Sequence, residues 1–195
     1  TPGLKPLPAQ IEAEEELGPD EQSNFRALSA RANYVSSDRV DLQFSSKECC
    51  RFMSKPGTLA QSALKRLGRY VLDHKRLVYK FPWQSATHIE VYSDTDWAGC
   101  PRTRKSTSGG AVMLGSHTIR TYSSTQTLVS LSSGEAELVG ISQSAAQALG
   151  PQKIKIHTDA TAAIGIAKRR GLGKVRHLHT TNLWNREKNR TKAFD

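Results

Sequence analysis

His88-Ile-Glu-Val-Tyr-Ser-Asp94 is the stretch of sequence from which the fold follows most directly. Polar and apolar side chains alternate along its first residues, which is the pattern of a half-buried β-strand. The stretch ends on a carboxylate, Asp94, at the point where the strand is expected to stop. Open α/β sheets place functional side chains at strand ends. The stretch therefore predicts one strand of a sheet with an acidic residue at its edge.

Two more strands and a helix are predicted on the C-terminal side of this strand. Residues 110–114 and 117–123 have strand character and are joined through Gly115-Ser116, which predicts a hairpin. Ser132-Ser-Gly-Glu135 has the form of a capping box, with a hydroxyl first and a carboxylate three residues later. It opens a helix that ends at Gly150-Pro151. Three antiparallel strands are therefore expected before this helix.

Further along the chain, strands and helices alternate. Residues 153–157 predict a fourth strand, and residues 160–170 predict a short Ala-rich helix that ends at a glycine. A short strand and a last helix are expected within 176–192. This order of elements predicts an α/β fold with a mixed sheet, in which three antiparallel strands are followed by parallel strands with helices.

The sequence before residue 84 differs from the rest in composition and in the spacing of its apolar residues. Residues 1–21 contain four of the eight prolines and six acids against one lysine, which indicates an extended acidic lead. Residues 22–83 carry apolar side chains at helical spacing, interrupted at Lys55-Pro-Gly57, and predict a small module of three helices. The α/β domain is then expected to occupy residues 84–195.

The chain is strongly basic. Among its 195 residues, Lys and Arg number 28 and Asp and Glu number 18, for a formal net charge of +10. The excess is concentrated in 168–192, which contains nine basic residues and one acid. Such a cluster is typical of a surface that contacts phosphates, so we expect a polyanionic partner. A solvated surface that only keeps the protein soluble is the alternative.

Several classes of protein are disfavoured by what the sequence lacks. No apolar run approaches the length needed to cross a bilayer, and the first residues do not resemble a signal peptide, so we expect an intracellular protein. The three cysteines are an odd number and do not form a disulfide framework. Neither a Gly-x-Ser-x-Gly pattern nor a P-loop occurs, which argues against a serine hydrolase or an NTPase.

Three carboxylates fall where such a fold would gather them. Asp94 ends the first strand, Glu137 lies in the first turns of the helix, and Asp159 follows the fourth strand. Carboxylates packed together repel one another unless a cation lies among them, and their hard oxygens suit Mg²⁺ or Mn²⁺. Two such ions could support a phosphodiester displacement. From spacing alone, caps or solvated charges explain these acids at least as well, and Asp159 fits a helix N-cap.

Longer blocks of sequence carry a resemblance to a known family. Tyr92-Ser-Asp-Thr-Asp-Trp-Ala-Gly99, Arg104-Lys-Ser-Thr-Ser-Gly109 and Leu131-Ser-Ser-Gly-Glu-Ala-Glu-Leu138 resemble, in order and spacing, the ribonuclease H domain of Ty1/copia-type retrotransposon Pol polyproteins. Upstream, Arg51-Phe-Met-Ser-Lys-Pro56 and Ala63-Leu-Lys-Arg-Leu-Gly-Arg-Tyr70 look like the connection region that joins reverse transcriptase to that domain. No Tyr-x-Asp-Asp polymerase motif occurs, so the chain is not itself a reverse transcriptase.

The resemblance implies a ribonuclease H-like fold, dependence on Mg²⁺ with Mn²⁺ as a substitute, and cleavage of the RNA strand in RNA/DNA hybrids. Asp94, Glu137 and Asp159 match three of the family's catalytic, metal-binding acids. Asp96 and Glu135 are also acidic, but they occupy non-catalytic places in the same blocks.

The chain departs from the family pattern at three places. His179 stands at the place of the family's fourth catalytic acid, and an imidazole there removes a hard oxygen that Mg²⁺ prefers. That imidazole could still move protons near working pH. The connection from Leu149 to Lys153 is short for the family, and the chain stops at Asp195 where family members usually continue, so we expect a C-terminally truncated domain.

These patterns leave two functions open. The first is a ribonuclease H-type endonuclease; the second is a domesticated, catalytically impaired protein that binds nucleic acid or serves as a structural subunit of a larger assembly. A ribonuclease H-like integrase or resolvase fits the blocks less well. The expected partners are an RNA/DNA hybrid or another nucleic acid, and the rest of a Pol polyprotein. The residues expected to contact nucleic acid are Arg104, Lys105, Ser106, Lys168, Arg169, Arg170, Lys174 and Arg176.

Overall fold

A computed structural model of the chain describes residues 2–3, 6–148 and 153–168. The chain divides into two compact units, Thr1–Tyr79 and Lys80–Asp195, and each is described by itself. The expected strand and helix within 176–192 and the shortened connection after Leu149 lie outside the described residues.

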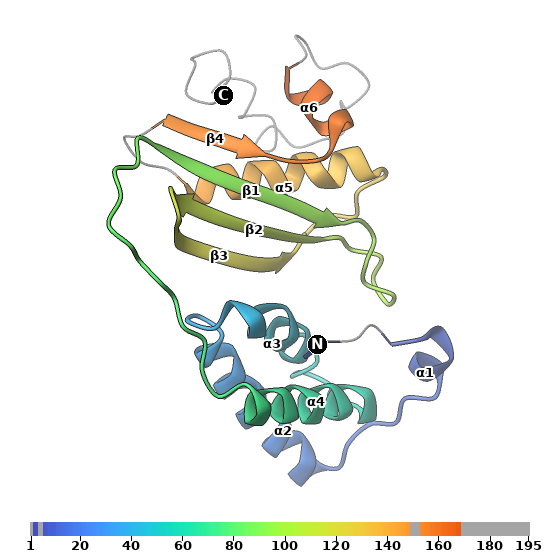
Figure 1. Ribbon diagram of the computed structural model, residues 1–195. Helices are drawn as coiled ribbons and strands as arrows, with labels where there is room; N and C mark the ends of the chain where they lie inside the picture. The colour runs from blue at the N-terminus through green and yellow to red at the C-terminus, as the bar shows by residue number, and fades with distance from the viewer. Residues whose placement is uncertain (1, 4–5, 149–152, 169–195) are drawn as a thin grey trace. The chain divides into compact units, whose positions relative to one another are not determined.

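The first unit is helical, as its apolar periodicity predicts (Figure 1). Its three longer helices match the expected number, and a short N-terminal helix and a 3-10 turn accompany them. The elements are α1 (Pro8–Glu12), α2 (Pro19–Val35), η1 (Val40–Leu42), α3 (Gln43–Cys50) and α4 (Thr58–Asp73).

The core of this unit is apolar and includes part of the expected lead. Phe25, Leu42 and Leu67 are almost fully buried in one cluster. Leu17 packs in the same cluster, and its backbone N–H donates to the carbonyl of Pro56. Burial of one large apolar side chain therefore ties the end of the proline-rich stretch to the helices, although its composition predicts an extended segment.

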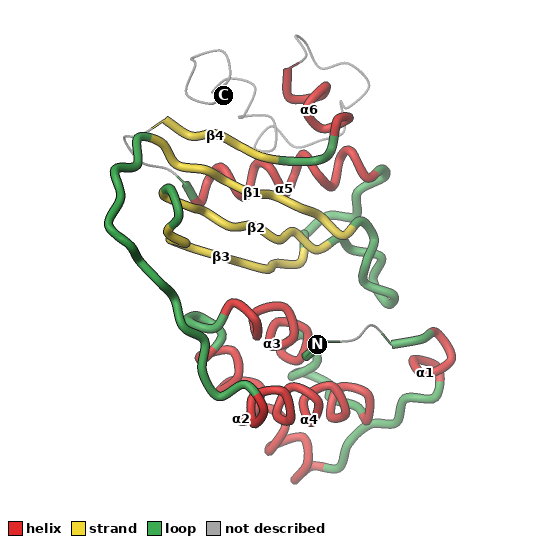
Figure 2. The backbone as a smooth tube through the Cα atoms, viewed as in Figure 1, coloured by secondary structure: helices red, strands yellow, loops and turns green. Residues whose placement is uncertain are grey.

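The second unit contains a four-stranded mixed sheet, which confirms the expected fold class (Figure 2). The strand order is β3-β2-β1-β4. Strand β2 pairs antiparallel with both β1 and β3, whereas β4 runs parallel to β1. The strands are β1 (His88–Asp96), β2 (Thr107–Leu114), β3 (His117–Thr125) and β4 (Lys153–His157).

Two helices accompany this sheet, α5 (Ser133–Gln147) and α6 (Thr161–Lys168). Helix α5 starts as predicted, because the Ser132 hydroxyl accepts a hydrogen bond from the backbone N–H of Glu135. The Glu135 carboxylate in turn accepts from the N–H of Leu131, one residue before the cap. Val91 and Val112 of the sheet are buried in a cluster with Ala145 of α5.

Strands β1 and β2 extend further than their hydrophobic alternation predicts. Asp94 pairs with Gly109, and the ladder continues to Asp96 and Thr107. These extra positions carry Ser, Thr, Gly and Asp, which give no apolar signal, but their backbone groups still pair in the sheet. The extension makes Asp94 a paired residue of β1, two positions before the strand ends.

Two expectations about the class of protein can be compared with the structure. Within the described ranges, no helix is long and apolar enough to cross a membrane. Cys49, Cys50 and Cys100 do not form disulfides with one another in the structure.

Candidate metal site at the end of strand β1

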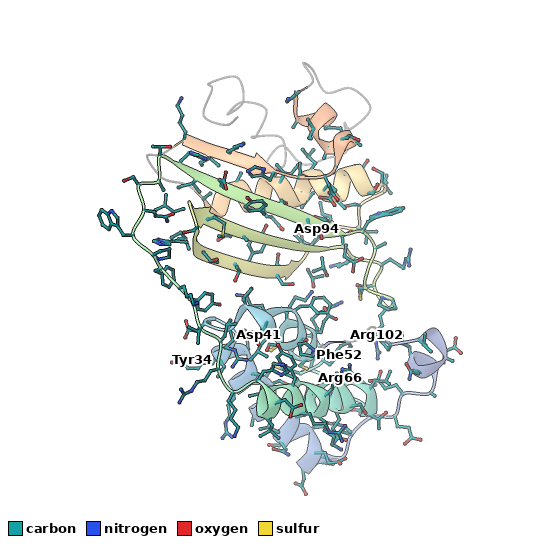
Figure 3. All side chains as sticks on the ribbon, in the orientation of Figure 1. Tyr34, Asp41, Phe52, Arg66, Asp94 and Arg102 are labelled. Atoms are coloured by element: carbon teal, nitrogen blue, oxygen red, sulfur yellow. The ribbon has the colours of Figure 1, made fainter. Side chains whose placement is uncertain are left out.

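The structure brings together the three carboxylates singled out in the sequence. One side-chain oxygen of each of Asp94, Glu137 and Asp159 lies within 4.8 Å of the others. They come from β1, from α5 and from the turn that follows β4; Figure 3 labels Asp94. Among the described residues, no other group of His, Cys, Asp and Glu side chains converges in this way.

Strand register explains why the two aspartates meet. In the parallel pair of β1 and β4, Tyr92 lies opposite His157. Asp94 and Asp159 each follow by two residues, so both reach the same edge of the sheet. Along β1, Val91, Ser93 and Thr95 are buried, whereas Tyr92 and Asp94 point to the exposed face. Both aspartates are exposed and stand at the rim of the site.

Glu137 is held differently, because it is buried. Its residue is only 8% exposed, and its Oε1 accepts a hydrogen bond of 3.1 Å from the backbone N–H of Thr95. Its Oε2 is also buried and has no hydrogen-bond partner in the part of the chain that the structure describes. The Oε1 of Glu137 is therefore fixed by β1, and its Oε2 is available to bind an ion held by the cluster.

Helix α5 approaches the sheet closely at one glycine. A Cβ on Gly140 would clash with the Oγ1 of Thr95 and would lie 3.3 Å from the Oγ of Ser93. Gly140 follows Glu137 by less than one helical turn, on the side of α5 that faces β1. This close approach brings the Glu137 carboxylate within reach of the Thr95 N–H.

The electrostatics of the cluster favour a cation. The pKa of Glu137 is raised to about 6. Burial is the largest cause, the charges of Asp94 and, more weakly, Asp159 act in the same direction, and the hydrogen bond from the Thr95 N–H opposes the shift. An uncompensated buried carboxylate next to two others is costly, and a divalent cation offsets that cost. Hard carboxylate oxygens are the ligands that Mg²⁺ and Mn²⁺ take. The donor set and the unpartnered Oε2 therefore fit such an ion.

Two members of the cluster, Asp94 and Asp159, line a hollow of about 500 Å³. Its lining includes Asp94, Asp159, Gly109 and the aromatic pair Tyr92 and His157, whose rings stack 4.7 Å apart. Glycine at position 109 carries no side chain over this region. The carboxylates of Asp94 and Asp159 are consequently reachable from outside the protein, whereas that of Glu137 is buried.

The residues expected to contact nucleic acid are only partly described by the structure. Arg104 and Lys105 lie in the loop between β1 and β2, where Arg104 is exposed and adopts a positive φ of 55°. Lys168 is exposed at the end of α6. Arg169, Arg170, Lys174, Arg176 and His179 lie outside the described residues.

Ser106 differs from its expected role. It is fully buried, and its hydroxyl accepts a hydrogen bond from the backbone N–H of Ala98. Its own carbonyl accepts from the N–H of Gln126. The expectation of a phosphate contact is corrected here, because Ser106 supports the neighbouring loop and has no surface to offer a ligand.

Two residues around the cluster were not singled out from the sequence. Thr95 acts through its backbone N–H, which no side-chain motif reports. Gln126 is 2% exposed and bonds to both the sheet and α5. A polar residue just after a strand is ordinarily a loop residue, so no sequence signal marks it as buried.

The curated proteins that the chain resembles include retrotransposon Pol polyproteins. It is 31% identical over 151 residues to an uncharacterized mitochondrial protein of Arabidopsis thaliana, AtMg00810, covering 75% of this chain and 61% of that protein. It is 30% identical over 128 residues to the retrovirus-related Pol polyprotein from transposon RE2, and 29% identical over 125 residues to that from transposon RE1, both of Arabidopsis thaliana.

The matches differ in how much of each protein they cover. Each Pol polyprotein match takes in 64% of this chain but only 9% of the RE2 polyprotein and 8% of the RE1 polyprotein. The chain thus spans less than two thirds of these three relatives. No protein-family model matches the sequence.

Proposed function

We propose a function from the premise that this chain belongs to the family of proteins derived from copia-type retrotransposon Pol polyproteins. Its second unit is a ribonuclease H-type endonuclease that cleaves the RNA strand of RNA/DNA hybrids. The observation that carries the proposal is the convergence of Asp94, Glu137 and Asp159 within 4.8 Å. The mixed sheet, with β4 parallel to β1, supports it because it supplies two of these acids at one edge.

The three carboxylates would hold Mg²⁺, or Mn²⁺ in its place. When bound, such ions lower the pKa of an attacking water and stabilise the leaving oxygen of a phosphodiester displacement. The chain contributes a fixed ligand, Glu137, whose Oε1 is restrained by the Thr95 N–H. Asp94 and Asp159 stand at the exposed rim, where a polymeric substrate can approach without entering the protein.

Basic residues would hold the substrate backbone. Arg104 and Lys105 lie in the loop that joins the two strands flanking the site, and Lys168 ends the helix after Asp159. In sequence, Lys168 begins the basic segment 168–192. Phosphate contacts by Lys and Arg make binding salt-dependent, so hybrid affinity should fall steeply as salt rises.

The direct test is cleavage of a labelled RNA/DNA hybrid by the full chain in Mg²⁺ and in Mn²⁺. Asp94→Asn should abolish cleavage, because it removes one metal-binding charge while keeping the side-chain shape. Glu90→Gln is the matched control, since Glu90 lies on the same strand and the same face but outside the cluster. Equal activity of Asp94→Asn and the control would contradict the proposed site.

The residue at position 179 favours a second function, which is binding of nucleic acid without cleavage. His179 stands where the resembling family has its fourth acid, so the site could bind nucleic acid without cleaving it. In that case the protein would act as a nucleic-acid-binding or structural subunit. Hybrid binding without cleavage by the natural chain, and Mg²⁺-dependent cleavage restored by His179→Asp, would support this function over the first.

The polyprotein relatives also suggest a context. Because the matched regions are small parts of the RE1 and RE2 polyproteins, we infer that this chain corresponds to one region of a larger Pol polyprotein. Its helical first unit would then stand where the connection to a reverse transcriptase lies.

A further inference from the structure

A buried glutamine joins the sheet to helix α5 beside the carboxylate cluster. Gln126 directly follows β3, and its side chain lies in the interior of the second unit. Its Nε2 donates two hydrogen bonds, one of 2.9 Å to the Oγ of Ser108 and one of 2.8 Å to the carbonyl of Ala136. Both N–H groups of the amide are therefore used, one on a strand and one on the helix.

The two acceptors are the immediate neighbours of the cluster. Ala136 precedes Glu137 in α5. Ser108 lies opposite Thr95 in the β1–β2 ladder, next to Gly109, which lies opposite Asp94. Thr95 is also the residue whose N–H holds Glu137. One side chain thus connects the strand position beside Asp94 to the helix position beside Glu137.

The orientation of the amide is determined by its surroundings. The Oε1 of Gln126 accepts a hydrogen bond of 3.2 Å from the hydroxyl of Ser130, and its backbone N–H donates to the carbonyl of Ser106. Turning the amide over would place its oxygen against the carbonyl of Ala136, where two acceptors repel. Gln126 is consequently fixed at both its backbone and its side chain.

We propose that Gln126 is a positioning residue of the metal site, which sets the place of Glu137 relative to Asp94 without touching the ion. The proposal rests on the proposed metal-binding role of the cluster. Residues bonded directly to metal ligands change metal affinity about 10- to 100-fold when they are replaced, and Gln126, which acts through Ala136 and Ser108, is expected at the lower end of that range. Loss of the two Nε2 bonds should weaken metal binding in that range, even where the protein remains folded.

The test is Mn²⁺ binding to the full chain by isothermal titration calorimetry, together with the unfolding temperature in EDTA. Gln126→Met keeps the length of the side chain and removes both donors; it should raise the Kd for Mn²⁺ at least tenfold at temperatures well below unfolding. Ser130→Ala is the matched control, because it removes only the bond to Oε1 and should leave the Kd within about twofold of the natural chain.

Each outcome separates this inference from the proposed function. If the natural chain binds no Mn²⁺, both fail. If the natural chain binds Mn²⁺ and folded Gln126→Met binds it equally well, only the positioning role is overturned and Gln126 is structural. Should Gln126→Met not fold, Ser108→Ala removes the strand-side acceptor of the amide and leaves Gln126 itself in place. A raised Kd for Mn²⁺ is then expected, and an unchanged Kd would overturn the positioning role.

Discussion

The two units differ in the kind of side chain that they bury. The helical unit packs large apolar side chains such as Phe25, Leu42 and Leu67 against one another. Beneath the carboxylates of the second unit, by contrast, α5 meets the sheet through small and polar residues. The buried small or polar residues there are Ser93, Thr95, Ser108, Glu137, Gly140 and Ser144, and the same helix also packs against the apolar cluster that contains Val91, Val112 and Ala145.

The difference separates an interior that only stabilises its unit from one that also places polar atoms. Apolar packing stabilises a unit without directing any polar atom. The polar interface leaves the hydroxyls of Ser93 and Thr95 and the Oε2 of Glu137 without hydrogen-bond partners among the described residues. Buried polar atoms of this kind are costly, and sites for ligands are where such costs collect. The unpartnered polar atoms therefore lower the stability of the second unit at the place where its carboxylates converge.

The largest effect is expected from Leu67→Ala in the helical unit. Removing a fully buried leucine should cost about 3 kcal/mol of the free energy of unfolding, because it leaves a cavity in an apolar core. Circular dichroism of thermal unfolding measures the loss. A change in Mn²⁺ affinity would contradict the separation of roles.

Gly140→Ala should affect the polar interface next. The added Cβ clashes with Thr95, so α5 must move away from β1 at a cost of about 2 kcal/mol, although alanine ordinarily favours a helix. Because the shift separates Glu137 from the Thr95 N–H, Mn²⁺ binding should weaken as well. Gly68→Ala in α4 is the control, since a Cβ at Gly68 meets no neighbour. Unchanged metal affinity in Gly140→Ala would show that the close approach is not required.

A smaller effect is expected from Glu137→Gln without metal. The folded-state pKa of Glu137 is raised to about 6, so its ionised form opposes folding above that pH and the opposition is relieved as the pH falls. The variant should therefore unfold a few degrees higher than the natural chain at pH 8 in EDTA, and the difference should shrink below pH 5. An equal difference at both pH values would contradict this cause.

The smallest effect is expected from Asp41→Asn, which changes the pH dependence in the opposite direction. The Arg39 guanidinium makes two hydrogen bonds to Asp41 and lowers the pKa of that carboxyl. The ion pair therefore stabilises the helical unit fully at pH values above the usual carboxyl pKa. This stabilisation is lost as the pH falls through the lowered pKa that Asp41 has in the folded protein. Asn should cost less than about 1 kcal/mol at pH 7 and flatten the acid side of the stability profile.

Loop contacts give a further contrast between pattern and structure. Trp97 belongs to one of the blocks that resemble the retrotransposon family, and a tryptophan is expected to pack inside. It is 47% exposed, and its indole N–H donates to the carbonyl of Ser130. This hydrogen bond links the turn after β1 to the loop before α5, a contact that the sequence does not reveal.

By itself, the sequence determined the elements and the three acids. Hydrophobic alternation located β4 at 153–157, the capping box located the start of α5, and the blocks around Asp94 and Glu137 indicated a carboxylate cluster. These features are local, because each depends on residues within a few positions of one another. A local pattern survives in the sequence and can be recognised without the fold.

Only the tertiary structure decided how the acids are held. The Thr95 N–H on Glu137 spans 42 residues, and the Gln126 amide joins a strand and a helix that are far apart in the chain. Ser106 turned out to be buried for the same reason, since its partners lie in other segments. Hydrogen bonds between distant small polar residues follow no period in the sequence, because strand register and helix approach set them, and both exist only once the chain is folded.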